Sequence, residues 1–309
     1  MGKIFGIKEA EGKTIEIMGM FDHPYTPERK KEFIFFRPFL RDFAAFMDYE
    51  TSPANGFFYY GPTGTGKSDG IRNFAAVTGT PLYEINANVD TSMADIFGEN
   101  TLVNGNVIWK DGPMVKAARD GGIFAIHEIS YARANVIGAL NTILDRADRF
   151  IIPNLESEVI KIHKNFKFVV TDNTNGTGDY TGRFIGVKPL NLAFMDRFML
   201  AKSEYLPKVV EVELLKQYAP GLSSDTAAAM VDFANKTREM FNGTENTPPS
   251  ISGLITTRTL IMWGILSVKF RAAQNSIKYS LERAFLNKLP PDEVDGVESV
   301  AKTFFSLWN

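Results

Sequence analysis

The stretch FFYYGPTGTGKS (residues 57–68) decides the fold of this chain. An aromatic run typical of a buried strand leads into GPTGTGKS, which fits the pattern G-x-x-x-x-G-K-[ST]. Such a loop curls so that its backbone N–H groups surround phosphate oxygens, and the helix after it adds partial positive charge. We predict that Lys67 reaches the β- and γ-phosphates of ATP and that Ser68 binds Mg²⁺. The residues expected to hold the nucleotide are Gly61, Pro62, Thr63, Gly64, Thr65, Gly66, Lys67 and Ser68.

Strands and helices alternate on both sides of this loop. Further strands are expected over residues 82–86, 123–127 and 167–171, and helices over 67–77, 113–119 and 132–147. Because the strands are mostly apolar and are separated by helices, the pattern predicts a parallel sheet that is covered by helices on both faces. A β-hairpin is expected between residues 148 and 165, a short strand over 14–18, and a helix from Pro38. The apolar face of that helix is predicted to pack in the core through Phe39, Leu40, Phe43, Phe46 and Met47.

The second part of the chain has a different pattern. After about residue 206 every long segment has helical periodicity, interrupted by the loop GTENTPPSIS (243–252). We therefore predict an N-terminal extension over residues 1–30, an α/β core over 31–205 and a helical domain over 206–309.

Composition excludes several classes of protein. The 309 residues include no Cys, so thiolate metal sites, disulfides and a Cys nucleophile are excluded, and the three scattered His do not suggest a metal centre. The formal net charge of −2 argues against a nucleic-acid partner. No apolar run is long enough to span a membrane, and the N-terminus lacks the apolar core of a signal peptide, so we expect a cytoplasmic protein.

Two further strand ends carry polar groups suited to ATP hydrolysis. IFAIHEIS (123–130) places Glu128 after an apolar strand, where it is expected to act as the general base on the attacking water. Asn173 also follows an apolar strand, and its side-chain amide is expected to orient the attacking water. The neighbouring Asp172 is expected to point away from the nucleotide, because successive side chains on a strand face opposite sides. A surface carboxylate at residue 128 is the alternative.

Together these residues resemble the AAA+ ATPases, in particular the MoxR-like group and the ATPase subunit of aerobic cobaltochelatase. The resemblance covers most of residues 35–309. It rests on ADIFGENTLVNGNVIWKDGPMVKA (94–117), TDNTNGTGDYTGRFIGVKPLNLAFMDRF (171–198), ISGLITTRTLIMWG (251–264) and RAFLNKLPPDEVDGVESVAKTFF (283–305). It implies a P-loop AAA+ core followed by a C-terminal helical lid domain.

The resemblance also implies roles for single residues. Asn173 matches the sensor-1 Asn, and Arg258 matches the sensor-2 Arg that contacts the γ-phosphate from the lid. Arg197 matches the Arg that reaches the ATP of a neighbouring subunit, where a permanently charged guanidinium stabilises the transferring phosphoryl group. The alternatives for that finger are Arg146, Arg149 and Arg183.

His127 departs from the family pattern, which has an Asp that orders Mg²⁺ at this position. Neutral imidazole is a poor partner for a hard cation, so we treat His127 as a doubtful metal residue beside Ser68. Restoring the acid with His127→Asp is expected to raise Mg²⁺ affinity or the ATPase rate.

The function implied by the resemblance is an ATP hydrolase that works as a homo-oligomeric ring, usually a hexamer. The ring would remodel or activate a partner protein, in this family often one with a von Willebrand-type domain. Relatives also occur in tailed phages, so phage origin with action in the host cytoplasm is a further expectation. The alternative is a nucleotide-gated assembly scaffold with weak or no hydrolysis because of His127. The hairpin at 148–165 and the loop near Phe97 are possible substrate contacts, and simple packing is the alternative for Phe97.

Overall fold

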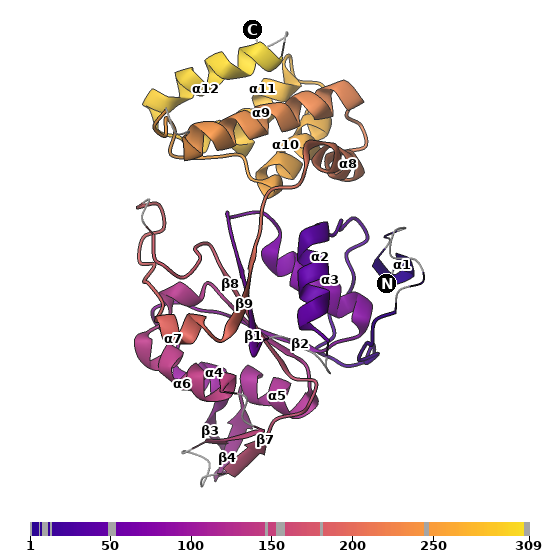
Figure 1. Cartoon of the computed structure of the whole chain (residues 1–309). Helices are drawn as coiled ribbons and strands as arrows, with labels where there is room; N and C mark the ends of the chain where they lie inside the picture. The colour runs from indigo at the N-terminus through magenta and orange to yellow at the C-terminus, as the bar shows by residue number, and fades with distance from the viewer. Residues whose placement is uncertain are drawn as a thin grey trace. The chain divides into compact units, whose positions relative to one another are not determined.

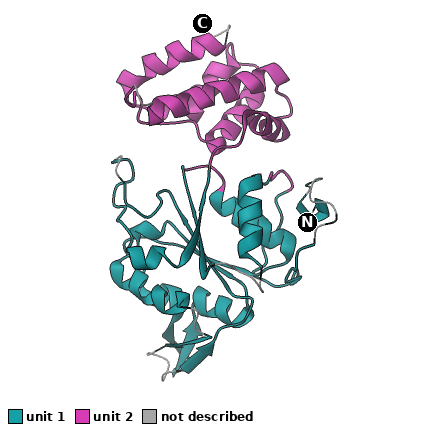
Figure 2. Cartoon of the chain, in the orientation of Figure 1, with its two compact units in different colours: residues 1–30, 35–62, 67–203 teal, residues 31–34, 63–66, 204–309 magenta. Residues whose placement is uncertain are grey.

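The computed structural model describes residues 2–5, 7, 12, 14–48, 54–145, 148–152, 158–179, 182–243 and 247–305. The chain divides into two compact units, which Figure 2 shows in different colours. The α/β unit comprises residues 1–30, 35–62 and 67–203. The helical unit comprises residues 31–34, 63–66 and 204–309. Each unit has its own hydrophobic core, as expected for parts that fold around separate clusters of apolar side chains.

The α/β unit is built on the predicted parallel sheet, which the structure confirms. Its strands lie in the order β2-β5-β8-β1-β9, and each neighbouring pair runs parallel. Their bounds are β1 Gly56–Tyr60, β2 Leu82–Asn86, β5 Ile123–His127, β8 Lys167–Asp172 and β9 Phe198–Lys202. The central strands β5 and β8 are buried along their whole length, which explains why they are apolar on both faces.

Helices cover both faces of this sheet (Figure 1). Side chains of alternate strand residues pack on one face against α2 (Arg37–Phe46) and α3 (Lys67–Thr78). Those of the other face pack against α5 (Pro113–Asp120) and α6 (Ala134–Leu144), together with the short α4 (Met93–Phe97) and α7 (Leu192–Met195). The predicted apolar face of α2 is confirmed, because its five members are 0–4% exposed.

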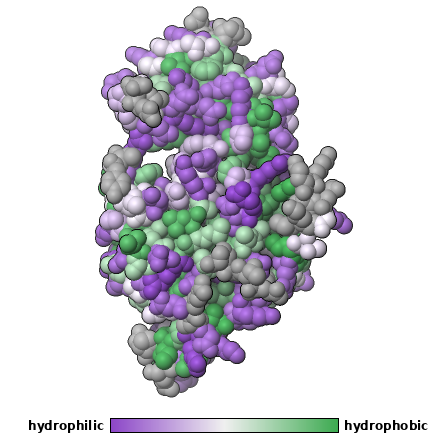
Figure 3. All heavy atoms as spheres, viewed as in Figure 1, coloured by the Kyte–Doolittle hydropathy of each residue, from purple (hydrophilic) through white to green (hydrophobic). Residues whose placement is uncertain are grey.

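Two antiparallel hairpins extend from the second of these layers. The predicted one consists of β6 (Arg149–Ile152) and β7 (Glu158–Lys161), and its turn lies outside the described residues. The other, β3 (Gly98–Val103) with β4 (Asn106–Asp111), was not predicted. Asn104 and Gly105 both have positive φ, which gives the two-residue turn that suits a twisted hairpin. Leu102 and Val107 face each other across it and are 72% and 69% exposed, and Figure 3 shows apolar surface in this part of the unit.

One predicted strand is wrong, one strand was missed, and one open alternative is decided. Residues 14–18 form no strand; Ile15 is a partly buried member of the core in irregular chain, so its alternation with polar residues reflects one-sided packing. Strand β9 was missed because the four-residue α7 before it is too short to give a helical period. Phe97 is only 8% exposed and packs edge-on against Phe150, so the packing alternative is correct for this side chain.

The helical unit contains α8 (Lys208–Tyr218), α9 (Ser224–Asn242), α10 (Thr257–Lys269), α11 (Ser276–Ala284) and α12 (Pro291–Phe304). They pack around the fully buried Trp263 and Phe233. A buried ion pair joins α8 to α9: Arg238 Nη2 lies 2.7 Å from Glu211 Oε1, and both side chains are at most 6% exposed. In the described parts of the chain, no helix combines the length and apolar character needed to cross a membrane.

Candidate nucleotide-binding site

The glycine-rich loop lies between the end of β1 and the start of α3, as the sequence predicts. Gly61, Gly64 and Gly66 have φ values of 145°, 72° and 85°, in the region that favours glycine. At Gly61 a side chain would also overlap the carbonyl oxygen of Ser203, so this position requires glycine for space as well as for its backbone angle. The loop therefore has the backbone conformation that a phosphate-binding turn requires.

Lys67 is the first residue of α3, and its ammonium group lies within the loop. Its Nζ donates to the carbonyl oxygens of Gly61 at 2.7 Å and Pro62 at 2.9 Å, and to Asn173 Oδ1 at 3.1 Å. Burial lowers the pKa of Lys67 to about 8, and the negative charges of Asp172 and Glu128 oppose that shift. The lysine is thus held by oxygen acceptors in a partly dehydrated position, where the charge of a phosphate would have a large effect.

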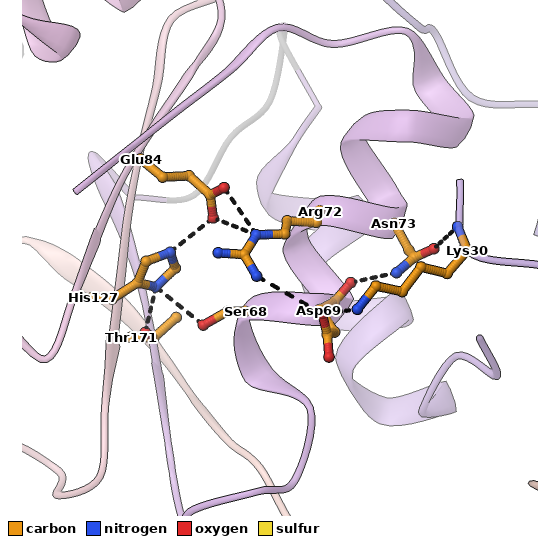
Figure 4. Close-up of polar contacts among 8 residues, drawn as sticks. All are labelled: Lys30, Ser68, Asp69, Arg72, Asn73, Glu84, His127 and Thr171. Carbon is orange, nitrogen blue, oxygen red and sulfur yellow. Dashed lines mark hydrogen bonds and ion pairs between the residues drawn. The ribbon is translucent and has the colours of Figure 1, made fainter. Parts of the chain in front are cut away.

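His127 ends β5 and contacts the hydroxyl of Ser68 (Figure 4). Its Nδ1 lies 3.3 Å from Ser68 Oγ and 2.7 Å from Thr171 Oγ1. Its Nε2 lies 2.8 Å from Oε1 of Glu84, on the neighbouring strand β2. The imidazole therefore connects the predicted magnesium residue to a carboxylate.

Glu84 is a member of this site that our sequence analysis missed. Arg72 on α3 donates from Nε to both of its carboxylate oxygens, at 3.0 and 2.9 Å, and Arg72 also approaches Asp69 at 3.8 Å. The only sequence signal was a charged residue within the apolar strand LYEIN. Burial acts to raise the pKa of Glu84, but the hydrogen bonds and charges of His127 and Arg72 outweigh it and lower this pKa overall.

The residues present fit a magnesium ion held mainly by the nucleotide. Mg²⁺ typically takes one or two protein oxygens and completes its shell with phosphate oxygens and water. Ser68 Oγ supplies such an oxygen beside the phosphate loop. His127 faces the Ser68 hydroxyl through Nδ1 and Glu84 through Nε2. Within the described residues no cluster of three His, Cys, Asp or Glu side chains offers a separate metal site.

Glu128 directly follows His127 in a constrained turn. It has φ 59° and ψ 43°, a left-handed conformation that is uncommon for a residue other than glycine. Its N–H donates to the carbonyl oxygen of Thr171 at 2.7 Å. Two residues later, the N–H of Ser130 donates to Asp172 Oδ2 at 2.9 Å, and the Ser130 hydroxyl bonds the same oxygen. Strand β8 thus holds the turn that carries Glu128 at two points.

Asn173 and Asp172 serve different partners. Asn173 lies beside Lys67, whereas Asp172 accepts from Ser130 and, through Oδ1, from the N–H of Thr174 at 3.0 Å. Asp172 is 1% exposed. The structure therefore uses Asp172 as an anchor for two loops, a role that our sequence analysis did not propose.

Arg197, the predicted arginine finger, lies toward the other end of β1 from the P-loop. Arg197 precedes β9, and the parallel register pairs Gly56 with Phe198, so Arg197 lies at the edge where β1 begins. The P-loop follows the opposite end of β1, about 13 Å away at 3.3 Å per residue. There the Arg197 guanidinium binds Asp145 at 2.6 Å. Arg258 is an exposed residue in the first turn of α10, in the helical unit.

The alternatives for the arginine finger are also in the α/β unit. Arg149 lies at the start of β6 and binds the adjacent Asp148 at 3.2 Å, and Arg183 lies in the loop after β8. Arg146 falls outside the described residues.

Models of known protein families match both units of the chain. A family model described as an AAA domain of the dynein-related subfamily matches residues 56–198, and a CbbQ/NirQ/NorQ C-terminal model matches residues 211–303. The chain is 28% identical to the aerobic cobaltochelatase subunit CobS of a Sinorhizobium species, over 85% of this chain and 78% of CobS. It is 31% identical to the protein NorQ of Paracoccus denitrificans, over 62% of this chain and 68% of NorQ. It is 30% identical to the protein CbbQ of Hydrogenophilus thermoluteolus, over 58% of this chain and 64% of CbbQ.

Proposed function

Because the chain belongs to the MoxR-like group of AAA+ ATPases, we propose that it hydrolyses ATP and uses the cycle to remodel or activate a partner protein. The observation that carries the proposal is the convergence of three chain segments at one edge of the sheet. Lys67 and Ser68 come from the P-loop, His127 and Glu128 from the end of β5, and Asn173 from the end of β8.

Each side chain has a distinct task in this proposal. The loop N–H groups and Lys67 bind the β- and γ-phosphates, and Ser68 offers its oxygen to Mg²⁺. The bound Mg²⁺ neutralises phosphate charge. Glu128 takes a proton from the attacking water, and Asn173 orients that water through its amide. The left-handed turn and its two anchors on β8 keep Glu128 in place, so little reorganisation is needed when the water reacts.

The position of Arg197 supports an oligomer. A guanidinium at the starting edge of β1 is too far from the P-loop of its own chain to act there, but it is suited to the site of a neighbour. A head-to-tail interface of this kind closes into a ring when its rotation permits, and we propose a ring, with six subunits as in other AAA+ proteins. Arg258 would act on the γ-phosphate from the helical unit, which we propose as the lid domain over residues 206–309, after the core over 31–205 and the extension over 1–30.

The partner is proposed from the relatives. The chain resembles a subunit of a cobaltochelatase, and it is also similar to NorQ and CbbQ. We propose a partner protein of the same kind as in this family, such as one that contains a von Willebrand-type domain, and no nucleic acid.

A comparison of steady-state ATPase rates tests the enzymatic proposal. The wild type should turn over ATP, Glu128→Gln should bind ATP but lose turnover by about 100-fold or more, and Lys67→Ala should lose binding. A wild-type rate no higher than that of Glu128→Gln would refute hydrolysis.

Mixing variants tests the shared site. Arg197→Ala and Lys67→Ala should each be inactive alone, and a mixture should recover part of the activity if Arg197 acts on a neighbour. No recovery in mixed oligomers would assign the finger to another arginine. Affinity capture with ATP-loaded Glu128→Gln then identifies the partner.

A further inference from the structure

The imidazole of His127 lies between a carboxylate on one side and two hydroxyls on the other (Figure 4). Nε2 faces Glu84 Oε1 at 2.8 Å, and Nδ1 faces the hydroxyls of Thr171 at 2.7 Å and Ser68 at 3.3 Å. The side chain of His127 is only 4% exposed. Water therefore competes little for these positions, and the neighbours decide where the ring protons lie.

The carboxylate determines which nitrogen carries a proton. An ionised carboxylate accepts hydrogen bonds and donates none, so Nε2 must donate to Glu84. The ion pair with Arg72 favours the ionised form of Glu84, to which the contact with His127 also contributes. The other tautomer would turn a nitrogen lone pair toward an anionic oxygen at 2.8 Å, which is repulsive. In the neutral ring with hydrogen on Nε2, Nδ1 is an acceptor.

An acceptor at Nδ1 has a direct effect on Ser68. The hydroxyls of Thr171 at 2.7 Å and Ser68 at 3.3 Å then share one ring lone pair. Because no ring hydrogen points at Ser68 Oγ, the lone pairs of this oxygen are left for a cation. An ionised aspartate at position 127 would likewise direct no hydrogen at this oxygen. A neutral imidazole can therefore perform this part of the task, provided that a second group holds it in the correct tautomer.

We infer that Glu84 is a positioning residue for the magnesium site: it fixes His127 with hydrogen on Nε2, so that Nδ1 is an acceptor toward the hydroxyls of Thr171 and Ser68 and directs no hydrogen at Ser68 Oγ. The pair Glu84–His127 thus stands in for the acid that the family pattern has at residue 127. The inference rests on the proposed ATPase function for its purpose, but the hydrogen positions are a property of the chain itself.

The ring state is measured first, in nucleotide-free protein. Solid-state NMR of sedimented full-length chain labelled with ¹⁵N-histidine distinguishes a protonated from an unprotonated ring nitrogen. The chain has three His, and the signals of His127 are assigned by their loss in His127→Gln. We expect Nδ1 unprotonated and Nε2 protonated. A wild-type ring with a proton on Nδ1, in either the neutral or the charged form, overturns the inference.

Two variants separate the carboxylate from its ion pair. Glu84→Gln can donate to Nε2 as well as accept from it, so we expect the tautomer to become mixed. Arg72→Gln removes the ion pair but leaves the carboxylate on Nε2, so the wild-type tautomer should persist. An unchanged ring in Glu84→Gln contradicts the role of Glu84. If Glu84→Gln does not fold, the spectra of the wild type and of Arg72→Gln still show whether Nδ1 of His127 is unprotonated, as the inference requires.

The second readout is the factor by which Mg²⁺ increases ADP affinity, measured by calorimetry with and without chelator. Glu84→Gln should reduce this factor by about 10-fold, the usual effect of removing the partner of a metal-site residue. The matched control is Glu99→Gln, the same change at an exposed position of β3, which should keep the wild-type factor. Adding His127→Asp to Glu84→Gln should restore the factor, because the new carboxylate accepts from Ser68 without a second anion beside it.

The outcomes separate this inference from the proposed function. If Glu84→Gln has the same magnesium factor for ADP as the wild type, the role of Glu84 is refuted. The ATPase proposal is not affected by that result. If the wild type binds ADP but does not hydrolyse ATP, the ATPase proposal is refuted. The NMR spectra of the His127 ring and the magnesium factor still test the role of Glu84.

Discussion

Lys67 Nζ lies 3.1 Å from Asn173 Oδ1, a contact between residues 106 positions apart in the sequence. It joins the P-loop to the carboxyl end of β8, and it places a neutral amide beside the lysine that is proposed to bind the γ-phosphate. An acceptor at this position can also receive a hydrogen bond from water. The contact therefore makes Asn173 a candidate for positioning the reacting groups.

Asn173→Ala should lower ATP turnover by about 100-fold, since misplacement of a reacting group by about 1 Å has an effect of that size. Affinity for ADP should remain near the wild-type value, because the loop and Lys67 are retained. Asn175→Ala is the control, since Asn175 lies in the same loop and accepts hydrogen bonds from the N–H and the hydroxyl of Thr177. Equal rates in the two variants would remove Asn173 from the mechanism.

Asp172→Ala should destabilise the α/β unit by about 1–3 kcal/mol, because the buried N–H of Ser130 would lose its acceptor. Urea unfolding measures this loss. Asp90→Ala, at a side chain that is 86% exposed, is the control and should change stability by less than about 0.5 kcal/mol. A similar unfolding midpoint for both variants would show that Asp172 does not anchor the turn.

Glu211→Gln should cost the helical unit about 3 kcal/mol, since it leaves the buried Arg238 without its charged partner. The exposed pair Lys208–Asp232 joins the same two helices, with side chains 50% and 37% exposed. Asp232→Asn is therefore a matched control, with an expected cost of at most about 1 kcal/mol. The two costs are compared by denaturant titration, and equal values would refute the difference due to burial.

Lys167 gives a pH dependence of known sign. Its Nζ caps α2 by donating to the carbonyl oxygens of Phe46 and Asp48, both at 3.0 Å. Burial lowers the pKa of Lys167 from 10.5 to about 8, and the charge of Asp48 only partly opposes this. Between these two values the unfolded chain binds more protons than the folded one, so stability should rise with pH.

Lys167→Met tests this by the slope of stability against pH between about pH 8 and about pH 9.5. The variant should be less stable at all pH values because it loses the cap, but its slope should be smaller than that of the wild type. Tyr59 and Tyr205, whose pKa burial raises to about 12, contribute alike to the slopes of both proteins, so the difference between the slopes reports Lys167. Parallel slopes would show that the lysine does not titrate in this window.

Much of the fold could be predicted because its signals are local. The P-loop, its strand and its helix follow one another in the sequence. A proline and an apolar face in the sequence indicate α2. The β3–β4 hairpin also had a local signal, the Asn104–Gly105 turn, that we did not use. Strand β9 had none, because FMLAK is short and the helix before it, α7, has only four residues.

The site was harder to predict where it depends on which strands are neighbours. Glu84 meets His127 only because β2 lies beside β5, and a sequence of alternating strands and helices does not give that order. The anchor between Asp172 and Ser130 depends in the same way on β5 lying beside β8. The left-handed conformation of Glu128 is also set by these contacts and not by its residue type.

Asp172 and Asn173 are consecutive residues, yet one bonds the turn that carries Glu128 and the other bonds Lys67. A small displacement of this strand end would therefore alter both contacts in the same instant. The proposed general base Glu128 and the proposed phosphate-binding Lys67 are therefore mechanically linked through the one peptide unit that joins Asp172 to Asn173.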